Sequence, residues 1–300
     1  MIAAAERYIV QHNVANLYTE PDTSSPLATQ AIMGAVVTGE GQSNGFRRIT
    51  TEDRYGGWIS EGLLSPIRDS SEYLTTTVAT LFAEVYAAPN VQAELLTKFV
   101  VGSSVLIAHR AEVGDWVPVL LSFDEIGYIH RVSLNVTYSS PSENLQQVME
   151  SEIPRESILS AIGRQVSESA KHLIGTPYLW GGCTPFGIDC SGLTQLAYKL
   201  NGVQLLRDAH QQFTDRRFRH VEEGQGLESA LLEEGDLVVF SRRDDKHPTH
   251  IGLALGDGRF LHARGGKGVR IDFCDTMEYV ETYLGSVRLS ADADLAIEAA

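Results

Sequence analysis

The chain has 300 residues, 43% of them hydrophobic and 21% charged, which is typical of a soluble globular protein with room for two or three domains. Its formal net charge of −15 disfavours nucleic acid as a partner, because phosphate binding needs a basic patch. The same charge disfavours electrostatic adhesion to anionic membranes or wall polymers, so we expect neither a nucleic-acid nor a membrane partner.

Targeting signals and cysteines point to the cytoplasm. The start "MIAAAERYIVQHNV" lacks the basic and apolar regions of a signal peptide, and no apolar run approaches the ~20 residues that span a bilayer. The three cysteines, Cys183, Cys190 and Cys274, form neither a disulfide framework nor a CxxC zinc pattern. We therefore expect a cytoplasmic protein without metal or other cofactor, and nothing in the sequence indicates its oligomeric state.

The first half of the chain contains an internal repeat. The matching pairs are "LYTEP" at 17–21 with "VYAAP" at 85–89, Gly34 with Gly102, and "GWI" at 57–59 with "GYI" at 127–129. The first two pairs are 68 residues apart and the third is 70 apart, which indicates two copies of one unit with a short insertion. Short β-branched runs between turn residues predict that each copy is a small β-barrel.

These two copies resemble bacterial SH3-like domains, which open on a Tyr-x-x-Pro turn and close on a Gly-Trp-Ile or Gly-Tyr-Val strand. The first copy spans 5–67 and the second 74–137. The resemblance implies modules that bind cell-wall peptides or pack on a catalytic neighbour. A polar, serine-rich linker is expected over 138–155.

The composition changes after the linker, and residues 156–290 read as an α+β domain. Ile158, Ile162, Val166, Ala170 and Ile174 recur every fourth position, which predicts an amphipathic helix that ends at Gly175. The runs at 235–240, 250–256 and 259–264 predict consecutive antiparallel strands.

"GIDCSGLTQLAY" at 187–198 places a cysteine where a helix begins. Leu193, Leu196 and Ala197 have helical spacing, and Asp189 is a suitable N-cap. Cys190 then lies in the first helical turn, where free N–H groups and the helix dipole favour a thiolate nucleophile. A buried structural cysteine is the alternative.

Two of the nine histidines can share a site with Cys190. If Gly256, Asp257 and Gly258 form a three-residue hairpin loop, Gly252 pairs with His262, and His250 lies diagonally from His262 on the same face. A two-residue loop would put the two histidines on opposite faces. With the longer loop, one imidazole can act as base and the other can orient it.

"GTPYLWGG", "DCSG" and "THIGLALGDGRFLHA" together closely resemble the NlpC family of cell-wall cysteine peptidases, which have a papain-like fold. The resemblance covers nearly all of residues 170–265. It implies that Cys190 is the nucleophile, His250 the general base and His262 the orienting third member. The Cys190 N–H and the Tyr178 hydroxyl would stabilise the oxyanion, although Tyr178 can also be read as a core tyrosine.

The family cleaves peptidoglycan stem peptides between D-glutamate, through its γ-carboxyl, and diaminopimelate or lysine. The substrate implied here is a murein tripeptide or tetrapeptide, and the missing signal peptide favours recycling over wall remodelling. Relatives with SH3-like domains require a free N-terminal L-alanine, whose ammonium is held by a tyrosine of the first barrel and by the aspartate before the nucleophile. "EDRYGGWI" matches that stretch at Tyr55, and Asp189 matches the aspartate.

Other residues have less specific matches. Ser191 resembles a serine that contacts the glutamate carboxylate, or it only supports the helix start. Glu52 and Asp53 could add charge beside the ammonium, or they are solvated loop residues. Arg207 and Asp208 match the family's "RDA/RDS" segment, and we expect a structural ion pair between them near the cleft rather than substrate contacts.

Two other classes stay open. A non-catalytic wall-binding module would not need an intact Cys190, His250 and His262. A papain-like amidase or acyltransferase would need an apolar acyl groove, whereas the residues placed beside the cleft are polar.

Overall fold

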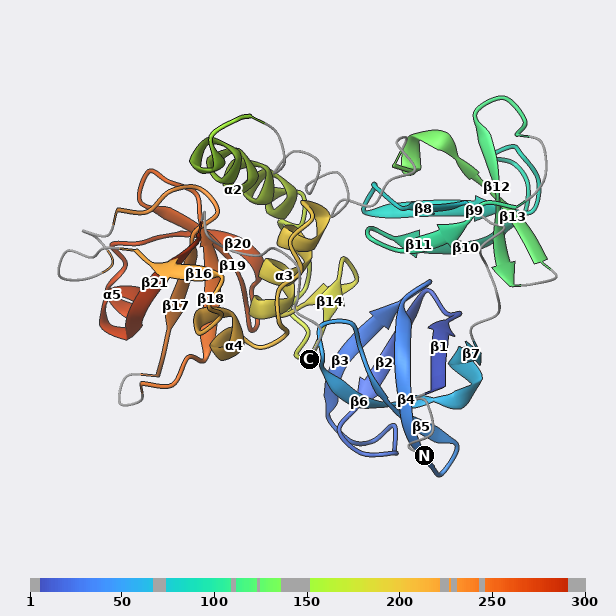
Figure 1. Cartoon of the computed structure of the whole chain (residues 1–300), viewed down its shortest axis with the longest axis horizontal. Coiled ribbons are helices and arrows are strands. Elements are labelled where there is room, and N and C mark those ends of the chain that lie inside the picture. The colour runs from blue at the N-terminus through green and yellow to red at the C-terminus, as the bar shows by residue number, and fades with distance from the viewer. Residues whose placement is uncertain are drawn as a thin grey trace. The chain divides into compact units, whose positions relative to one another are not determined.

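The computed structural model describes residues 6–66, 74–108, 112–122, 125–135, 152–221, 227, 231–242 and 246–290. The chain divides into two compact units, residues 1–140 and 141–300 (Figure 1). The first is built from strands and the second from helices and strands, as the sequence predicts. Most of the linker expected over 138–155 lies outside the described residues.

The first unit begins with a seven-stranded antiparallel sheet in the order β3-β2-β6-β5-β4-β1-β7 (Figure 1). Its elements are β1 (Glu6–Val10), β2 (Val14–Tyr18), β3 (Leu27–Ile32), β4 (Val36–Ser43), β5 (Phe46–Thr50), β6 (Gly56–Ser60), the 3-10 helix η1 (Glu61–Leu63) and β7 (Leu64–Pro66). Alternate side chains of these strands, such as Leu17 and Ile59, are buried in one core, as expected where one face of a sheet is packed.

The rest of the first unit repeats this pattern with two sheets, in the orders β10-β9-β13-β12 and β11-β8. The elements are β8 (Thr75–Thr77), β9 (Phe82–Tyr86), β10 (Leu95–Val100), β11 (Ser104–Leu106), β12 (Trp116–Ser122), β13 (Glu125–His130) and the 3-10 helix η2 (Arg131–Ser133). A second core, which includes Val85, Phe99 and Ile129, lies between them.

Equivalent backbone contacts confirm the internal repeat. The Gly34 N–H donates to Val10 O and the Gly102 N–H to Val78 O, both at 2.9 Å. Both glycines have a φ of 81°, in the left-handed region that favours glycine. Tyr18 pairs with Trp58 in the first copy as Tyr86 pairs with Tyr128 in the second.

The second unit has a six-stranded antiparallel sheet in the order β16-β21-β17-β18-β19-β20, and a two-stranded hairpin. Its strands are β14 (Cys183–Thr184), β15 (Gly187–Ile188), β16 (Phe218–His220), β17 (Leu237–Phe240), β18 (His250–Ala254), β19 (Arg259–Arg264), β20 (Gly268–Phe273) and β21 (Tyr283–Leu289). Its helices are α2 (Arg155–Lys171), α3 (Cys190–Leu200), α4 (Ala209–Phe213) and α5 (Met277–Thr282). Helix α3 packs against α2 and lies on β18 and β19 (Figure 1).

The predicted amphipathic helix is α2, with one difference. Ile158, Ile162, Val166 and Ala170 are buried on one face, as predicted. The helix ends at Lys171 rather than at Gly175, so Ile174 follows the helix and its side chain is 49% exposed. Two turn hydrogen bonds, from Leu173 and Ile174 back to α2, complete the end of the helix.

Strands β18 and β19 form the predicted hairpin. Leu253 pairs with Leu261 and Ala254 with Phe260, and this register places Gly252 opposite His262. Its three-residue loop is Gly256, Asp257 and Gly258, with φ values of 70°, 44° and 73°. The predicted odd loop is therefore confirmed, and His250 and His262 share a face. Within the described residues, no helix is long and apolar enough to cross a membrane.

Candidate active site

Cys190 is the first residue of α3, and the chain reaches it through a tightly capped turn. The Asp189 carboxylate accepts a hydrogen bond from the Gly192 N–H at 2.7 Å, which is the predicted N-cap. The same carboxylate accepts from the Gly181 N–H at 2.9 Å. These contacts fix the backbone on both sides of the sulfur, and Cys190 itself is 8% exposed.

Opposing effects set the resting state of Cys190. Burial, together with the negative charge of Asp189, raises the pKa of its thiol to about 12. Hydrogen bonds from the backbone N–H groups of Ile251 and Ser191 lower the pKa, as a helix start should, but they do not outweigh burial. The N–H groups at the helix start thus act in the predicted direction, but burial outweighs them, and Cys190 is a neutral thiol at neutral pH.

His250 and His262 contact each other on the two strands, β18 and β19, against which α3 packs. The hydrogen bond from the Ile251 N–H to Cys190 places the sulfur against the strand that begins at His250. His250 Nε2 is 2.7 Å from His262 Nδ1, so the two rings are hydrogen-bonded. Burial, together with smaller charge interactions with His262 and Arg264, lowers the pKa of His250 to about 3. His250 is therefore a neutral imidazole at neutral pH.

A second layer of polar groups lies behind His262, and the sequence reasoning did not find it. His262 is fully buried, and its Nε2 is 3.2 Å from Asp272 Oδ2. The Tyr279 hydroxyl donates to the same Oδ2 at 2.6 Å and lies 3.4 Å from His262 Nε2. The pattern that could have revealed Asp272 is the turn "RGGKG" at 264–268, which puts Asp272 on the same face as His262 once hairpin pairing is extended.

Gly252 makes room for His262 on the neighbouring strand. A Cβ atom at this position would lie 2.9 Å from Leu261 O and 3.1 Å from the Cβ of His262. The glycine therefore allows close approach of the two strands where the histidines meet.

Tyr178 lies close enough to Cys190 for the two groups to affect each other's ionisation. Burial, together with smaller contributions from Cys190 and Asp189, raises the pKa of Tyr178 to about 12. The hydroxyl is therefore protonated at neutral pH and can donate a hydrogen bond beside the sulfur. Tyr178 is also bridged to Ile188 through the backbone, which ties it to the strand before Asp189.

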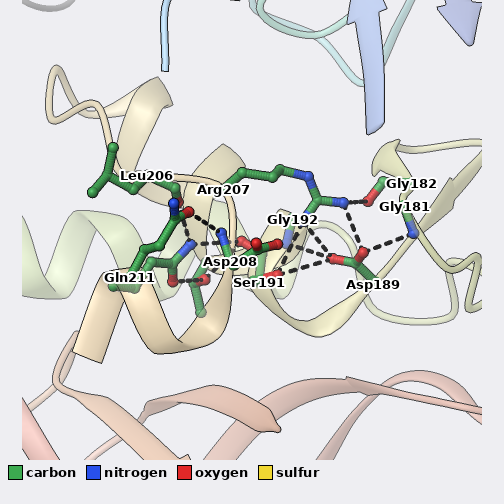
Figure 2. Close-up of polar contacts among 11 residues, drawn as sticks. Gly181, Gly182, Asp189, Ser191, Gly192, Leu206, Arg207, Asp208 and Gln211 are labelled. Atoms are coloured by element: carbon green, nitrogen blue, oxygen red, sulfur yellow. Dashed lines mark hydrogen bonds and ion pairs between the residues drawn. The ribbon is translucent and has the colours of Figure 1, made fainter. Parts of the chain in front are cut away.

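Arg207 binds both residues that flank the sulfur (Figure 2). Its guanidinium donates to Asp189 at 3.0 and 2.7 Å, to Ser191 Oγ at 3.0 Å and to Gly182 O at 3.4 Å. The Arg207 side chain is 2% exposed and that of Asp189 is 9% exposed, so the ion pair is buried. Burial works to lower the pKa of Arg207, and the pairing with Asp189 outweighs it and raises the pKa overall.

The main ionic partner of Arg207 is Asp189, and the expected partner Asp208 adds a weaker attraction. Arg207 reaches back to Asp189, whereas Asp208 is the N-cap of α4. The side chain of Gln211 accepts from the Asp208 N–H at 3.0 Å and completes a capping box (Figure 2). The two neighbouring side chains point to different places because Asp208 caps a helix, whereas Arg207 is buried against Asp189.

The remaining candidates, Tyr55, Glu52 and Asp53, belong to the first unit. They lie in the loop between β5 and β6, where the Thr51 N–H and hydroxyl both donate to Tyr55 O at 2.9 Å. The Thr51 hydroxyl also contacts the Asp53 carboxylate. Arg54 has a φ of 63°, a strained value that reverses the chain just before Tyr55. Glu52 is exposed and Asp53 partly buried.

The described part of the second unit thus combines a thiol, a hydrogen-bonded pair of neutral histidines and a protonated tyrosine hydroxyl. This set has the elements of nucleophilic catalysis by cysteine: a nucleophile, a base and a group that orients the base. Among the described residues, no cluster of three histidine, cysteine or acidic side chains is placed to hold a metal ion.

Two family models match the chain, the NlpC/P60 family at residues 175–288 and the bacterial dipeptidyl-peptidase Sh3 domain at residues 17–64. A solved NlpC/P60 family protein from Bacillus cereus matches 94% of this chain and 99% of its own with a TM-score of 0.75. At 21% identity this likeness shows a shared fold. The predicted fold class, SH3-like barrels before a papain-like α+β domain, is confirmed.

Relatives of known name are peptidases. Dipeptidyl-peptidase 6 of Lysinibacillus sphaericus is 28% identical over 281 residues, which cover 89% of this chain and 91% of the relative. A gamma-D-glutamyl-L-lysine dipeptidyl-peptidase of Bacillus cereus is 33% identical over 122 residues, covering 40% of this chain and 34% of the relative. The chain therefore joins a bacterial SH3 domain to an NlpC/P60 domain, and this second domain is a peptidase domain, a hydrolase, of the NlpC/P60 family.

Proposed function

We propose that this chain is a cysteine peptidase that hydrolyses the γ-D-glutamyl–diamino acid bond of murein peptides with a free N-terminal L-alanine. The observation that carries the proposal is the hydrogen bond between His250 Nε2 and His262 Nδ1, with the sulfur of Cys190 against the strand of His250. This contact occupies Nε2 of His250 and leaves Nδ1 as the nitrogen that can take the thiol proton.

The first half of the reaction forms a thioester. The Cys190 proton moves to His250 Nδ1 as the sulfur attacks the γ-carbonyl carbon of D-glutamate. The thiol and imidazole are both neutral at rest, so proton transfer accompanies the attack rather than preceding it. The Cys190 N–H, at the helix start, and the Tyr178 hydroxyl stabilise the oxyanion. Collapse breaks the carbon–nitrogen bond, and His250 returns the proton to the leaving amine of the diamino acid.

The second half releases the N-terminal dipeptide. Water attacks the thioester carbon and gives a proton to His250. The carbon–sulfur bond breaks, the sulfur leaves as a thiolate, and His250 reprotonates it. His262 keeps the His250 ring oriented through both halves. The products are L-alanyl-D-glutamate and the free diamino acid or a shorter peptide that begins with it.

The free amino group is the proposed basis of selectivity. Tyr55 and Asp189 would hold the alanine ammonium, and Ser191 would contact the α-carboxylate of D-glutamate. Asp189 already carries Arg207 as its counter-ion and accepts two backbone N–H bonds. The ammonium would therefore join a compensated carboxylate, so that Asp189 is not left as an unpaired buried charge when no ligand is bound. Glu52 or Asp53 would add negative charge on the side of Tyr55.

Two further observations support action on released wall peptides in the cytoplasm. The names of the relatives, dipeptidyl-peptidase 6 and gamma-D-glutamyl-L-lysine dipeptidyl-peptidase, describe release of a dipeptide, which needs a free N-terminus. All three cysteines are free thiols, as expected in a reducing compartment. We therefore propose a role in peptidoglycan recycling.

The test is a comparison of kcat/KM on three substrates: L-Ala-γ-D-Glu-meso-diaminopimelate, its N-acetyl form and intact sacculi. Recycling predicts fast cleavage of the free tripeptide and little of the other two. Equal rates on the free and acetylated peptides, or release of peptides from sacculi, would support wall remodelling instead. Transfer of the acyl group to an added amine in place of water would support the amidase or acyltransferase class. L-Ala-γ-D-Glu-L-Lys, run in parallel, gives the diamino acid preference.

A further inference from the structure

We infer that Asp272 is a positioning residue which, with Tyr279 and through His262, fixes which ring nitrogens of the two histidines carry protons and so keeps His250 Nδ1 free to act as the base. This inference rests on the proposed function for its catalytic meaning. Its structural content, the tautomers of His262 and His250, can be measured without any substrate.

The position of Asp272 follows from the strand register. His262 on β19 is directly opposite Arg270 on β20, and Asp272 is two residues further along the same strand. Residues two apart on a strand share a face, so Asp272 reaches diagonally to His262. Its Oδ2 is 3.2 Å from His262 Nε2, and the His262 ring is fully buried.

Tyr279 supports the assignment of the proton to His262 Nε2, because the hydroxyl already donates its single proton to Asp272. The hydroxyl donates to Asp272 Oδ2 at 2.6 Å and accepts from Arg264 Nη1 at 2.7 Å. It therefore presents a lone pair to His262 Nε2, 3.4 Å away. Both oxygens near this nitrogen are acceptors, so Nε2 of His262 carries the proton.

The rest of the relay follows from the chemistry of neutral imidazole. Burial lowers the pKa of His262 to about 4, so the ring is neutral at neutral pH and carries one N–H. With the proton on Nε2, Nδ1 is an acceptor, and the 2.7 Å contact requires His250 Nε2 to be the donor. Neutral His250 then has its lone pair on Nδ1, where a base for Cys190 is needed.

Asp272 can fix these tautomers of the two histidines because its carboxyl group stays ionised. Burial works to raise its pKa, but hydrogen bonds from Tyr279 and His262 lower the pKa overall. Arg270 adds bonds to Oδ1 at 2.8 Å from Nε and 2.6 Å from Nη2. The carboxylate is thus an acceptor towards His262.

Within the described ranges, the charged and titratable groups that face the histidine pair come from four elements besides β18. They are Cys190 on α3, Arg264 on β19, Arg270 and Asp272 on β20, and Tyr279 on α5. Asp272 is the group in this set that is both negatively charged at neutral pH and bonded to a histidine ring.

The decisive variant is Asp272→Asn. An amide can turn its N–H₂ group towards His262 Nε2, which then becomes an acceptor and moves the proton to Nδ1. His250 would in turn receive a hydrogen bond at Nε2 and carry its own proton on Nδ1, where it cannot act as a base. We expect kcat to fall by about 10- to 1,000-fold with KM little changed, since loss of an orienting carboxylate acts on the base rather than on binding.

The experiment measures the ring ¹⁵N and ¹H shifts of His250 and His262 in the substrate-free protein, with signals assigned by their loss in His250→Ala and His262→Ala. The matched control is Asp257→Asn at the other end of the hairpin, where the carboxyl group is exposed and paired with Arg259. Asparagine is well tolerated at the positive φ of this position. The control should keep the wild-type tautomers and kcat.

In the wild type we expect both histidines to be protonated at Nε2 and unprotonated at Nδ1. In Asp272→Asn we expect a shift towards protonation at Nδ1 together with the loss of kcat. A wild-type His262 protonated at Nδ1 would overturn the inference even if the variant fails to fold. So would a folded Asp272→Asn variant with unchanged tautomers and kcat. If the wild type shows the expected tautomers but cleaves no murein peptide, the proposed function fails and the positioning by Asp272 stands.

Discussion

Replacing Arg207 by methionine tests the buried ion pair beside Cys190. The substitution keeps an unbranched side chain of similar reach but removes the donors to both Asp189 oxygens, to Ser191 Oγ and to Gly182 O. It leaves the Asp189 carboxylate buried and without its counter-ion. Breaking a buried pair by removing one partner costs about 3–5 kcal/mol, and we expect the free energy of unfolding to fall by that amount.

The chain supplies a matched control in Arg259→Met. Arg259 and Asp257 also form an ion pair, with N–O distance 2.6 Å against 2.7 Å for Arg207 and Asp189, but their side chains are 42% and 56% exposed. An exposed pair contributes about 0.2–1 kcal/mol. The two variants therefore differ mainly in burial, and Arg207→Met should be at least about 2 kcal/mol more destabilising.

The assay is urea unfolding followed by circular dichroism, with the double variant Arg207→Met/Asp189→Asn as a third sample. The side-chain oxygen of the introduced asparagine can still accept from the Gly192 N–H, and no buried charge remains, so we expect the double variant to recover part of the lost stability. Equal losses in Arg207→Met and Arg259→Met would refute the reasoning. So would a double variant that is no more stable than Arg207→Met, because removing the charge of Asp189 would then relieve nothing.

Four further predictions follow from the site. Cys190→Ala should remove measurable hydrolysis without lowering the thermal unfolding temperature. His250→Ala should lower hydrolysis about as much, and His262→Ala should lower it less. Equal activity in Cys190→Ala and wild type would make the cysteine structural. Burial lowers the pKa of His250 to about 3 and raises that of Cys190 to about 12, so kcat/KM should stay level as pH falls through 6.5, the usual histidine pKa. A loss of half the rate near pH 6.5 would contradict a buried neutral base. Tyr55→Phe should reduce the ratio of kcat/KM for the free peptide to kcat/KM for the N-acetylated peptide by about 10-fold or more, while the acetylated peptide is cleaved as before. An unchanged ratio would show that Tyr55 is not part of the ammonium site. Gly252→Ala should lower the free energy of unfolding by about 1–3 kcal/mol and lower kcat, because the new Cβ crowds His262. A wild-type kcat would show that the two strands can move apart there without affecting catalysis.

The parts of the site that the sequence predicted depend on local rules. Asp189 caps α3 because an N-cap is decided within one helical turn, and Leu193 and Leu196 mark the same helix. The relation of His250 to His262 follows from the parity of one glycine-containing loop. In each case the deciding residues lie within a dozen positions of one another.

The parts that the sequence did not predict depend on tertiary packing. Arg207 binds Asp189, 18 residues away, rather than its neighbour Asp208, because α4 begins at Ala209 and uses Asp208 as its cap. Asp272 meets His262 only once β20 is added to the hairpin. The neutral thiol of Cys190 results from burial under the sheet, which outweighs the helix-start effect that the sequence could suggest.

The most direct test of the central claim is product identification from L-Ala-γ-D-Glu-meso-diaminopimelate in H₂¹⁸O, with wild type and Cys190→Ala in parallel. The account predicts L-alanyl-D-glutamate with one ¹⁸O in the γ-carboxyl group, free unlabelled diaminopimelate, and neither product with Cys190→Ala. Release of free L-alanine, cleavage at any other bond, or the same labelled dipeptide from Cys190→Ala would contradict it.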